Sequence, residues 1–281
     1  MKKNSNNVFL IFVFSIFSLV SCDDTEPENV TGSTTGTLRL YIEHVGTKVS
    51  SESNEHSSRI SNGNHSSNEP LYISDSLYVT ANHDTVSITA FNYLLTDFSY
   101  VKDGDTMTNS AVAFFIRHDL DQTSDDIEKL ITEIPVGTYS NINFLLGVND
   151  EANLTDNVTG ELEDAFYGGM VWTWSTGYKF AKIEGFLYSG GDTTAITKHI
   201  GTSTNKRDIT IDNEFTISEG LVTEVHLQVD ISDVLGGVSL GSTHSSHKLT
   251  SDINAIIMDS LAAQLSNPHH FMQTNEEEHN H

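Results

Sequence analysis

Histidine is the residue type with the most chemistry to offer in this chain. The sequence has 13 histidines, almost as many as its 14 lysines and arginines together, but a single cysteine, Cys22. Neutral imidazole is a common protein ligand for copper and zinc, and where thiolate is scarce it becomes the leading donor. Metal binding is therefore the first chemistry to consider.

Two of the histidines differ from the rest in position. Every second residue from Leu38 to His44 lies on one apolar face, which predicts a half-buried strand with His44 on its core side. His199 lies in the short β-like run ITKHIG at 196–201. A buried histidine can also simply be satisfied by a backbone carbonyl, and for each of the two taken singly that interpretation stays open.

Most of the other histidines are more easily explained by solvent exposure. His226 alternates with the apolar Val225 and Leu227, so it is predicted to face solvent. Five more lie in polar loops or turns, namely His56, His65, His83, His244 and His247. The end of the chain carries His269, His270, His279 and His281. This end suits either a low-affinity metal collector or a polar tail with no fixed structure.

An aromatic hairpin is predicted in the segment GMVWTWSTGYKFAKIEG at 169–185. Trp172 and Trp174 are two residues apart and therefore lie on one face of a strand. A Ser-Thr-Gly turn then leads to Tyr178 and Phe180. The simplest role for these rings is to fill the core.

Sites of other kinds have weaker support. The sequence has no phosphate-cradling glycine loop, no G-x-S-x-G elbow and no H-E-x-x-H helix, so we predict no catalytic residues and no enzyme activity. A cluster of oxygen donors offers a weak calcium site without the spacing of an EF-hand loop. Its members are Asn149, Asp150, Glu151, Asn153, Asp156 and Asn157.

Strands must position these residues. Runs with period two, or rich in β-branched and aromatic residues, alternate with turn-type clusters. They predict strands at 37–44, 86–101, 111–116, 127–134, 139–147, 171–174, 178–187, 207–217 and 222–231. Many strands without helices between them predict an all-β fold, an antiparallel β-sandwich. One short C-terminal helix is predicted over 251–265, with Ile253, Ile256, Ile257, Leu261 and Leu265 on one stripe.

The N-terminus predicts export. In residues 1–22 a short basic start precedes an apolar run too short to span a bilayer comfortably, which is typical of a signal peptide. The run ends in LVSC, which resembles a bacterial lipobox, so Cys22 is predicted to be lipidated; a plain signal peptide is the alternative. We expect a lipoprotein of the outer membrane, periplasmic or surface-exposed, held to the membrane by its lipid.

The remaining organisation follows from composition. Residues 23–36 are acidic and Thr/Gly-rich and predict a flexible tether, residues 37–265 form the β-sandwich domain, and residues 266–281 are a His/Glu-rich tail. Asp and Glu total 39, which gives a formal net charge of −25. Such a charge repels phosphate backbones and therefore excludes nucleic acid as a partner.

Several segments together resemble one known family, the MbnP-like copper-binding proteins of the cell envelope. The resemblance begins at Leu38 and covers nearly all of the chain from there on. Its blocks, in order, are LRLYIEHVG, SITAFNYLLTDFSYV, IPVGTYSNINFLLGVND, the tryptophan segment, ITKHIG and the histidine-containing end. Several blocks in the family's order are far more specific than any one of them.

The resemblance implies a β-sandwich that binds copper through imidazoles. In some members a tryptophan oxidised to kynurenine assists, and the oxidation is attributed to a dihaem partner of the MauG and cytochrome c peroxidase type. Carried over to this chain, His44 and His199 are the metal ligands, and Trp172 or Trp174 is the tryptophan to be oxidised.

We therefore expect a lipid-anchored protein that captures or stores copper near the tryptophan hairpin, without catalytic turnover. Two alternatives stay open. One is a surface adhesion or interaction domain whose histidines are incidental, and the other is a redox accessory that serves as the substrate of the dihaem protein.

Overall fold

The described part of the chain is made mainly of strands. The computed structural model describes residues 34–49, 65–74, 76–120, 126–153, 160–173, 177–243, 245–246 and 252–275. The chain divides into two units, residues 1–32 and 33–281, and everything described here belongs to the second. The predicted signal peptide, Cys22 and most of the tether lie outside the described residues.

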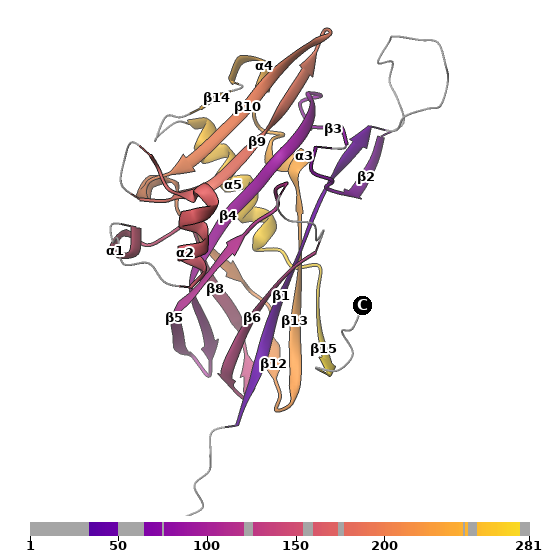
Figure 1. Ribbon diagram of the computed structural model, residues 1–281. Coiled ribbons are helices and arrows are strands. Elements are labelled where there is room, and N and C mark those ends of the chain that lie inside the picture. Colours follow the sequence, from indigo (N-terminus) through magenta and orange to yellow (C-terminus); the bar gives the residue numbers. More distant parts are fainter. Residues whose placement is uncertain are drawn as a thin grey trace, which may run out of the picture. The chain divides into compact units, whose positions relative to one another are not determined.

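The strands and helices follow the chain in this order (Figure 1). The strands are β1 (Thr35–Val49), β2 (His65–Pro70), β3 (Tyr78–Val79), β4 (Thr85–Lys102), β5 (Asp105–Ile116), β6 (Asp126–Pro135), β7 (Gly137–Tyr139), β8 (Asn141–Leu146), β9 (Lys179–Ser189), β10 (Asp192–Gly201), β11 (Arg207–Ile211), β12 (Phe215–Ile217), β13 (Leu221–Asp230), β14 (Ser245–Ser246) and β15 (His270–Asn275). The helical elements are α1 (Asp150–Asn153), α2 (Glu161–Ala165), the π-helix η1 (Phe166–Met170), the 3-10 helix η2 (Ser203–Asn205), α3 (Ile231–Val234), α4 (Leu240–Thr243) and α5 (Asp252–Leu265).

The strands form the two layers of a sandwich. In one layer β4 pairs with β5, β8 and β9, and the layer extends through β10 and β11. In the other, β1 lies between β6 and β13, and β13 also pairs with β15. The two-residue strand β3 pairs with both β1 and β4 and so links the layers. The predicted all-β sandwich is confirmed.

Not all strand pairs are antiparallel. β1 runs parallel to β13, and β10 runs parallel to β14, so the sheet is mixed. A hairpin can be predicted from the sequence because its turn is local. The pairing of β1 with β13 has no such local signal, because most of the domain lies between the two strands in the sequence. Their parallel pairing is decided by how two distant apolar faces meet in the core.

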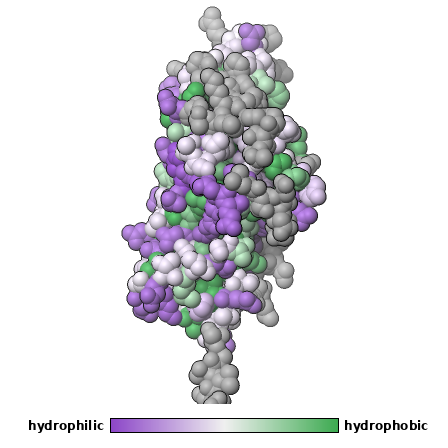
Figure 2. Space-filling model, turned by 90° about the vertical axis from the view of Figure 1, so that its left-hand side faces the viewer, coloured by the Kyte–Doolittle hydropathy of each residue, from purple (hydrophilic) through white to green (hydrophobic). Residues whose placement is uncertain are grey.

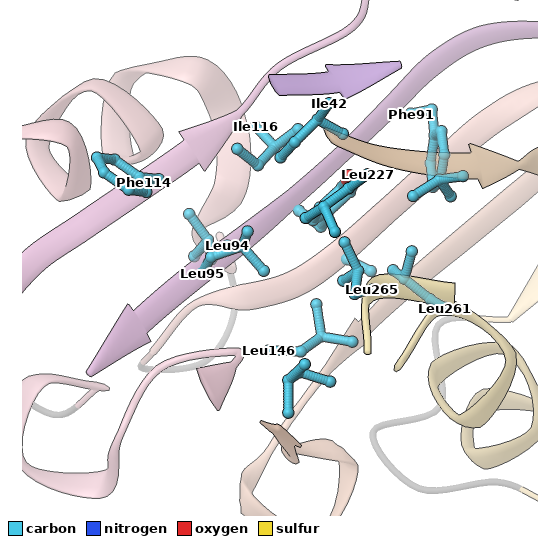
Figure 3. Close-up of a cluster of buried hydrophobic side chains, with 14 of the residues drawn as sticks. Ile42, Phe91, Leu94, Leu95, Phe114, Ile116, Leu146, Leu227, Leu261 and Leu265 are labelled. Carbon is cyan, nitrogen blue, oxygen red and sulfur yellow. The ribbon is translucent and has the colours of Figure 1, made fainter. Parts of the chain in front are cut away.

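The core lies between the layers. Ile42 of β1, Leu227 of β13 and Phe91 of β4 belong to one cluster of buried side chains, which Leu261 and Leu265 of α5 join (Figure 3). All five side chains are fully buried or nearly so. Since the chain has one cysteine, its stability depends on this apolar packing.

Helix α5 confirms the predicted C-terminal helix but presents a different stripe to the core. Ile256 is 40% exposed, while Asn254 and Met258 are buried. The buried residues of the helix are Asn254, Ile257, Met258, Leu261 and Leu265. The fully buried Asn254 belongs to a stripe that an apolar periodicity cannot reveal.

Part of the predicted C-terminal tail forms a strand. Within the predicted His/Glu-rich tail, residues His270–Asn275 form strand β15, antiparallel to β13. The inward ring of Phe271 stacks on Phe215, with centroids 5.8 Å apart. The two apolar residues of β15, Phe271 and Met272, are adjacent, so they give no alternation from which the sequence could predict this strand.

Candidate metal centre

Two imidazoles face one another between the two layers. The Nδ1 atoms of His44 and His118 are 2.9 Å apart, and the rings lie nearly parallel with centroids 5.2 Å apart. His44 is 1% exposed and His118 is 2% exposed. A hydrogen bond between two Nδ1 atoms requires that one is protonated and the other carries a lone pair.

The strand alternation explains the position of His44. Leu38, Leu40, Ile42 and His44 are all buried and alternate along one face of β1, as predicted. On the opposite layer, the ring of Phe91 packs on the imidazole with centroids 4.7 Å apart. The hydroxyl of Tyr93 lies 3.0 Å from His44 Nε2 and fixes the second ring nitrogen.

His118 is held in place by its backbone. It follows the end of β5, where the chain continues along the edge of β4: Phe91 N donates to His118 O (2.8 Å), and His118 N donates to Asn92 Oδ1 (2.9 Å). The amide of Asn92 also donates to Asp119, which accepts a hydrogen bond from Arg117. Both partners of the imidazole pair therefore sit on a fixed backbone.

The environment keeps His44 neutral. Burial, and secondarily the neighbouring His118, hold the pKa of His44 well below its usual range. Burial also raises the pKa of Tyr93 far above its ordinary value, so the phenol keeps its proton. A neutral imidazole has a lone pair that a metal can use, and a hydrogen-bonded partner on its other nitrogen fixes its orientation.

The donor set fits copper. Imidazole binds copper well, the two Nδ1 atoms already face each other, and two bonds of about 2 Å each reach across at most about 4 Å. A modest separation of the rings would admit one ion. Within the residues described, no group of three or more His, Cys, Asp and Glu side chains is arranged to hold a metal ion. The pair therefore suits an ion with few ligands.

His199 lies in different surroundings. Its Nε2 is 2.7 Å from Glu184 Oε1, and its side chain is 14% exposed. The hydrogen bond to His199 is the main cause that lowers the pKa of the Glu184 carboxyl. Trp172 meets the imidazole edge to face, with ring centroids 6.3 Å apart. His199 is therefore the histidine that contacts the tryptophan segment.

The structure does not bring His44 and His199 together. His199 is opposite Lys182, and Lys182 is opposite Asn92, so these three residues share one face of their layer. Phe91 and Tyr93 flank Asn92 and point the other way, toward His44. The imidazoles thus belong to opposite faces of the β4–β9–β10 layer, and the role of each as a ligand stays a separate prediction.

The described residues of the tryptophan segment do not form the predicted strand at 171–174 and show only a single antiparallel bridge. Val171 bridges Tyr178, and Trp172 N donates to Gly177 O. The indole of Trp172 is 7% exposed, its Nε1 donates to Tyr178 O at 3.2 Å, and Lys179 Nζ lies 5.6 Å from the ring centroid. Trp174 lies outside the described residues.

The oxygen donors of the weak calcium prediction have other roles. Asn149 Oδ1 accepts from Ala152 N and so caps α1. Asp150 contacts Ser203 and Lys206, and these two side chains lower the pKa of its carboxyl. Asn153 Oδ1 accepts from Tyr178 N at 2.7 Å. These atoms fasten α1 to its neighbours, while Asp156 and Asn157 lie outside the described residues.

His118 is the residue that sequence reasoning missed. The predicted strand at 111–116 ends just before it, yet Phe114, Ile116 and His118 keep the same alternation and are all buried. Extending the period by two residues would have placed its imidazole on the core side. Its partnership with His44, across 74 residues of chain, carries no local signal.

Comparison with known proteins identifies the family. The MbnP family model matches residues 59–256, well over half of the chain. The search of curated proteins yields no match. Among solved structures, MbnP from Methylosinus trichosporium is similar at 12% sequence identity and a TM-score of 0.47, covering 86% of this chain and 99% of that one. On the strength of the family match, this chain belongs to the MbnP family.

Proposed function

We propose that this protein binds copper in the cell envelope through the buried His44–His118 pair and thereby captures or stores it. Family membership links the chain at a general level to methanobactin-related, copper-associated envelope proteins. The observation that carries the specific proposal is the 2.9 Å approach of two buried Nδ1 atoms. Two imidazoles without a thiolate suit Cu(I), which accepts few ligands.

Burial suits retention of the ion. An ion held between the layers would be shielded from water and from competing small ligands, and the Tyr93 hydroxyl would orient the His44 ring. The same burial offers no room for a substrate, so we propose binding without catalytic turnover. In this proposal the tether and a lipid on Cys22 hold the domain at the outer membrane.

Copper titration tests this site. The chain from residue 22 on, carrying Cys22→Ser to remove its only thiol, is titrated with Cu(I) in competition with a chromophoric chelator. We expect His44→Leu and His118→Leu each to weaken binding at this site at least a hundredfold. His83→Asn, at an exposed turn, is the matched control. The same number of Cu(I) ions bound per chain, with the same affinities, in the His44→Leu, His118→Leu double variant as in the wild type would rule the site out.

Trp172 is the proposed position of oxidation to kynurenine by a dihaem partner. It lies against His199 and beneath the Lys179 cation, and its indole nitrogen is engaged by the backbone. Peptide mass analysis of protein purified from its native envelope tests this proposal. An unmodified Trp172 in that material would argue against it, whereas protein made without the partner would not be informative.

An interaction domain remains the second candidate function, because one face carries exposed aromatic residues. Tyr167 is 79% exposed and Phe166 is 44% exposed. Beside them lies an open cavity of about 540 Å³ whose lining includes Arg117, Lys129 and Glu161. Figure 2 views the molecule from the side of α1 and α2 and shows a largely hydrophilic surface with scattered hydrophobic residues. Tight copper-independent binding of a glycan or protein, lost in Tyr167→Ala, would favour this function.

A further inference from the structure

A second pair of histidines lies on the outer surface, at the edge formed by β13 and β15 (Figure 1). His226 and His270 are directly opposite each other in this antiparallel strand pair. Their rings stack with centroids 4.1 Å apart and planes 19° apart. Directly opposed residues on antiparallel strands have Cβ atoms about 5 Å apart, a spacing at which two side chains can reach one ion.

A thioether lies on the same face. Met272 is two residues from His270 on β15, so the two side chains share one side of the sheet. Met272 is also opposite Glu224, which shares its face with His226. The Met272 side chain is 41% exposed, and the His270 side chain is exposed as well. Two imidazoles and one accessible sulfur thus gather on one patch.

A buried ion pair holds His226. Glu224 is fully buried, and its Oε1 accepts from Arg39 at 2.7 Å and from Thr274 at 3.0 Å. Its Oε2 lies 3.1 Å from His226 Nε2. A carboxylate accepts the proton of that nitrogen, which leaves the lone pair of His226 on Nδ1. This carboxylate–histidine contact is the arrangement that orients metal-binding imidazoles.

We propose that His226, His270 and Met272 form a second, solvent-accessible copper site that takes Cu(I). Imidazole and thioether together favour Cu(I). Zn²⁺ is usually bound by imidazole with thiolate or carboxylate, and Ca²⁺ is bound by oxygen atoms. The stacked rings need only side-chain rotation to turn their nitrogens toward a common ion, because His270 is exposed. This site does not depend on the His44–His118 pair, since its residues lie on the outer face of β13.

The charges around the patch favour a bound cation. Glu224, Glu43 and Glu128 add carboxylates on this face, and Arg39 is paired with two of them. A monovalent cation would therefore meet a negative field there.

Copper stoichiometry tests the proposal in the chain from residue 22 on with Cys22→Ser. In the His44→Leu, His118→Leu background, we expect one Cu(I) per chain in competition with a chromophoric chelator. His270→Asn should abolish this binding, and Met272→Leu, which keeps the apolar volume, should weaken it at least tenfold. His269→Asn, the exposed neighbour, is the matched control and should bind as the background protein does.

X-ray absorption at the copper edge identifies the ligands. We expect a sulfur scatterer that is present in the background protein and absent in Met272→Leu. Unchanged binding in both His270→Asn and Met272→Leu would overturn the proposal, as would loss of binding in His269→Asn alone or binding of Zn²⁺ in preference to Cu(I). Because His270 and Met272 are exposed, the unfolding midpoints of their variants should stay close to that of the His44→Leu, His118→Leu background, which separates lost ligands from lost folding.

Discussion

Acidification should destabilise this protein through His44 in a way that one variant can isolate. The imidazole is 1% exposed, and burial and His118 hold its pKa well below the usual value. In the unfolded chain the same group titrates near its ordinary pKa of about 6.5. Below that pH the imidazole takes up a proton in the unfolded chain but not in the folded protein. The free energy of unfolding therefore falls as the pH decreases from about 6.5 toward the folded-state pKa.

The size of the effect follows from the linkage relation. Each pH unit below about 6.5 costs about 1.4 kcal/mol for one such histidine until the folded-state pKa is reached. Between pH 7.5 and 5.5 the loss attributable to His44 is therefore about 1.4 kcal/mol. With a urea dependence of about 2–3 kcal/mol per M, this corresponds to a midpoint shift of roughly 0.5 M.

Urea unfolding at pH 7.5, 6.5 and 5.5, followed by tryptophan fluorescence, measures this loss. Many carboxylates also titrate, so the informative quantity is the difference between the wild type and His44→Leu. We expect the variant to be less stable at pH 7.5, because Tyr93 and His118 lose their partner, but to lose about 1.4 kcal/mol less on acidification. His83→Asn, exposed in a turn, should follow the wild type. Equal pH dependence in His44→Leu and wild type would refute the reasoning.

Three further changes test how the fold is held together, each by urea unfolding. Lys198 is fully buried, and its Nζ has no hydrogen-bond partner among the residues that the structure describes. Burial lowers its pKa to about 8, so Lys198→Met should stabilise the protein at pH 7 by about 1–3 kcal/mol, and a loss of stability would contradict this. Arg39→Leu removes the guanidinium that is paired with the buried Glu224 carboxylate and should lower the free energy of unfolding by about 3–5 kcal/mol. Adding Glu224→Leu to this variant should restore part of that free energy. Gly185→Ala places a Cβ 2.0 Å from Ser87 O, so it should disrupt the β4–β9 pairing and cost several kcal/mol; a wild-type midpoint would show that the strands can move apart.

The sequence predicted what local periodicity encodes. The alternation around His44 placed its imidazole in the core, and the runs at 86–101 and 178–187 correspond to β4 and β9. The helix at 251–265 was found because fourteen residues with helical spacing are a strong signal. In each case the signal lies within one element and does not depend on its neighbours.

What the sequence could not predict depends on contacts between distant segments. The pairing of His44 with His118 requires two layers to close, and the polar contact between Asn92 and His118 N that places the second imidazole has no periodic signature. His199 was predicted as a metal ligand together with His44 because the resemblance to the MbnP-like family carries both histidines over as ligands. A period of two shows which residues share one face of a strand, but it does not show whether that face points into the core or away from it. His44 and His199 differ in this respect.

The two proposed copper sites should act independently, because the β1–β13 pair separates them. His226 is opposite Tyr41, whereas His44 lies three residues further along β1 and faces the interior. With about 3.3 Å per residue along a strand, the two sites are about 10 Å apart or more, on opposite faces. At such separations the energetic effects of substitutions usually add. We therefore expect His44→Leu and His270→Asn each to leave one Cu(I) bound with an affinity within about twofold of its wild-type value, and the double variant to bind none. A larger change in the Cu(I) affinity of the remaining site would show that the two sites are coupled through the β1–β13 pair.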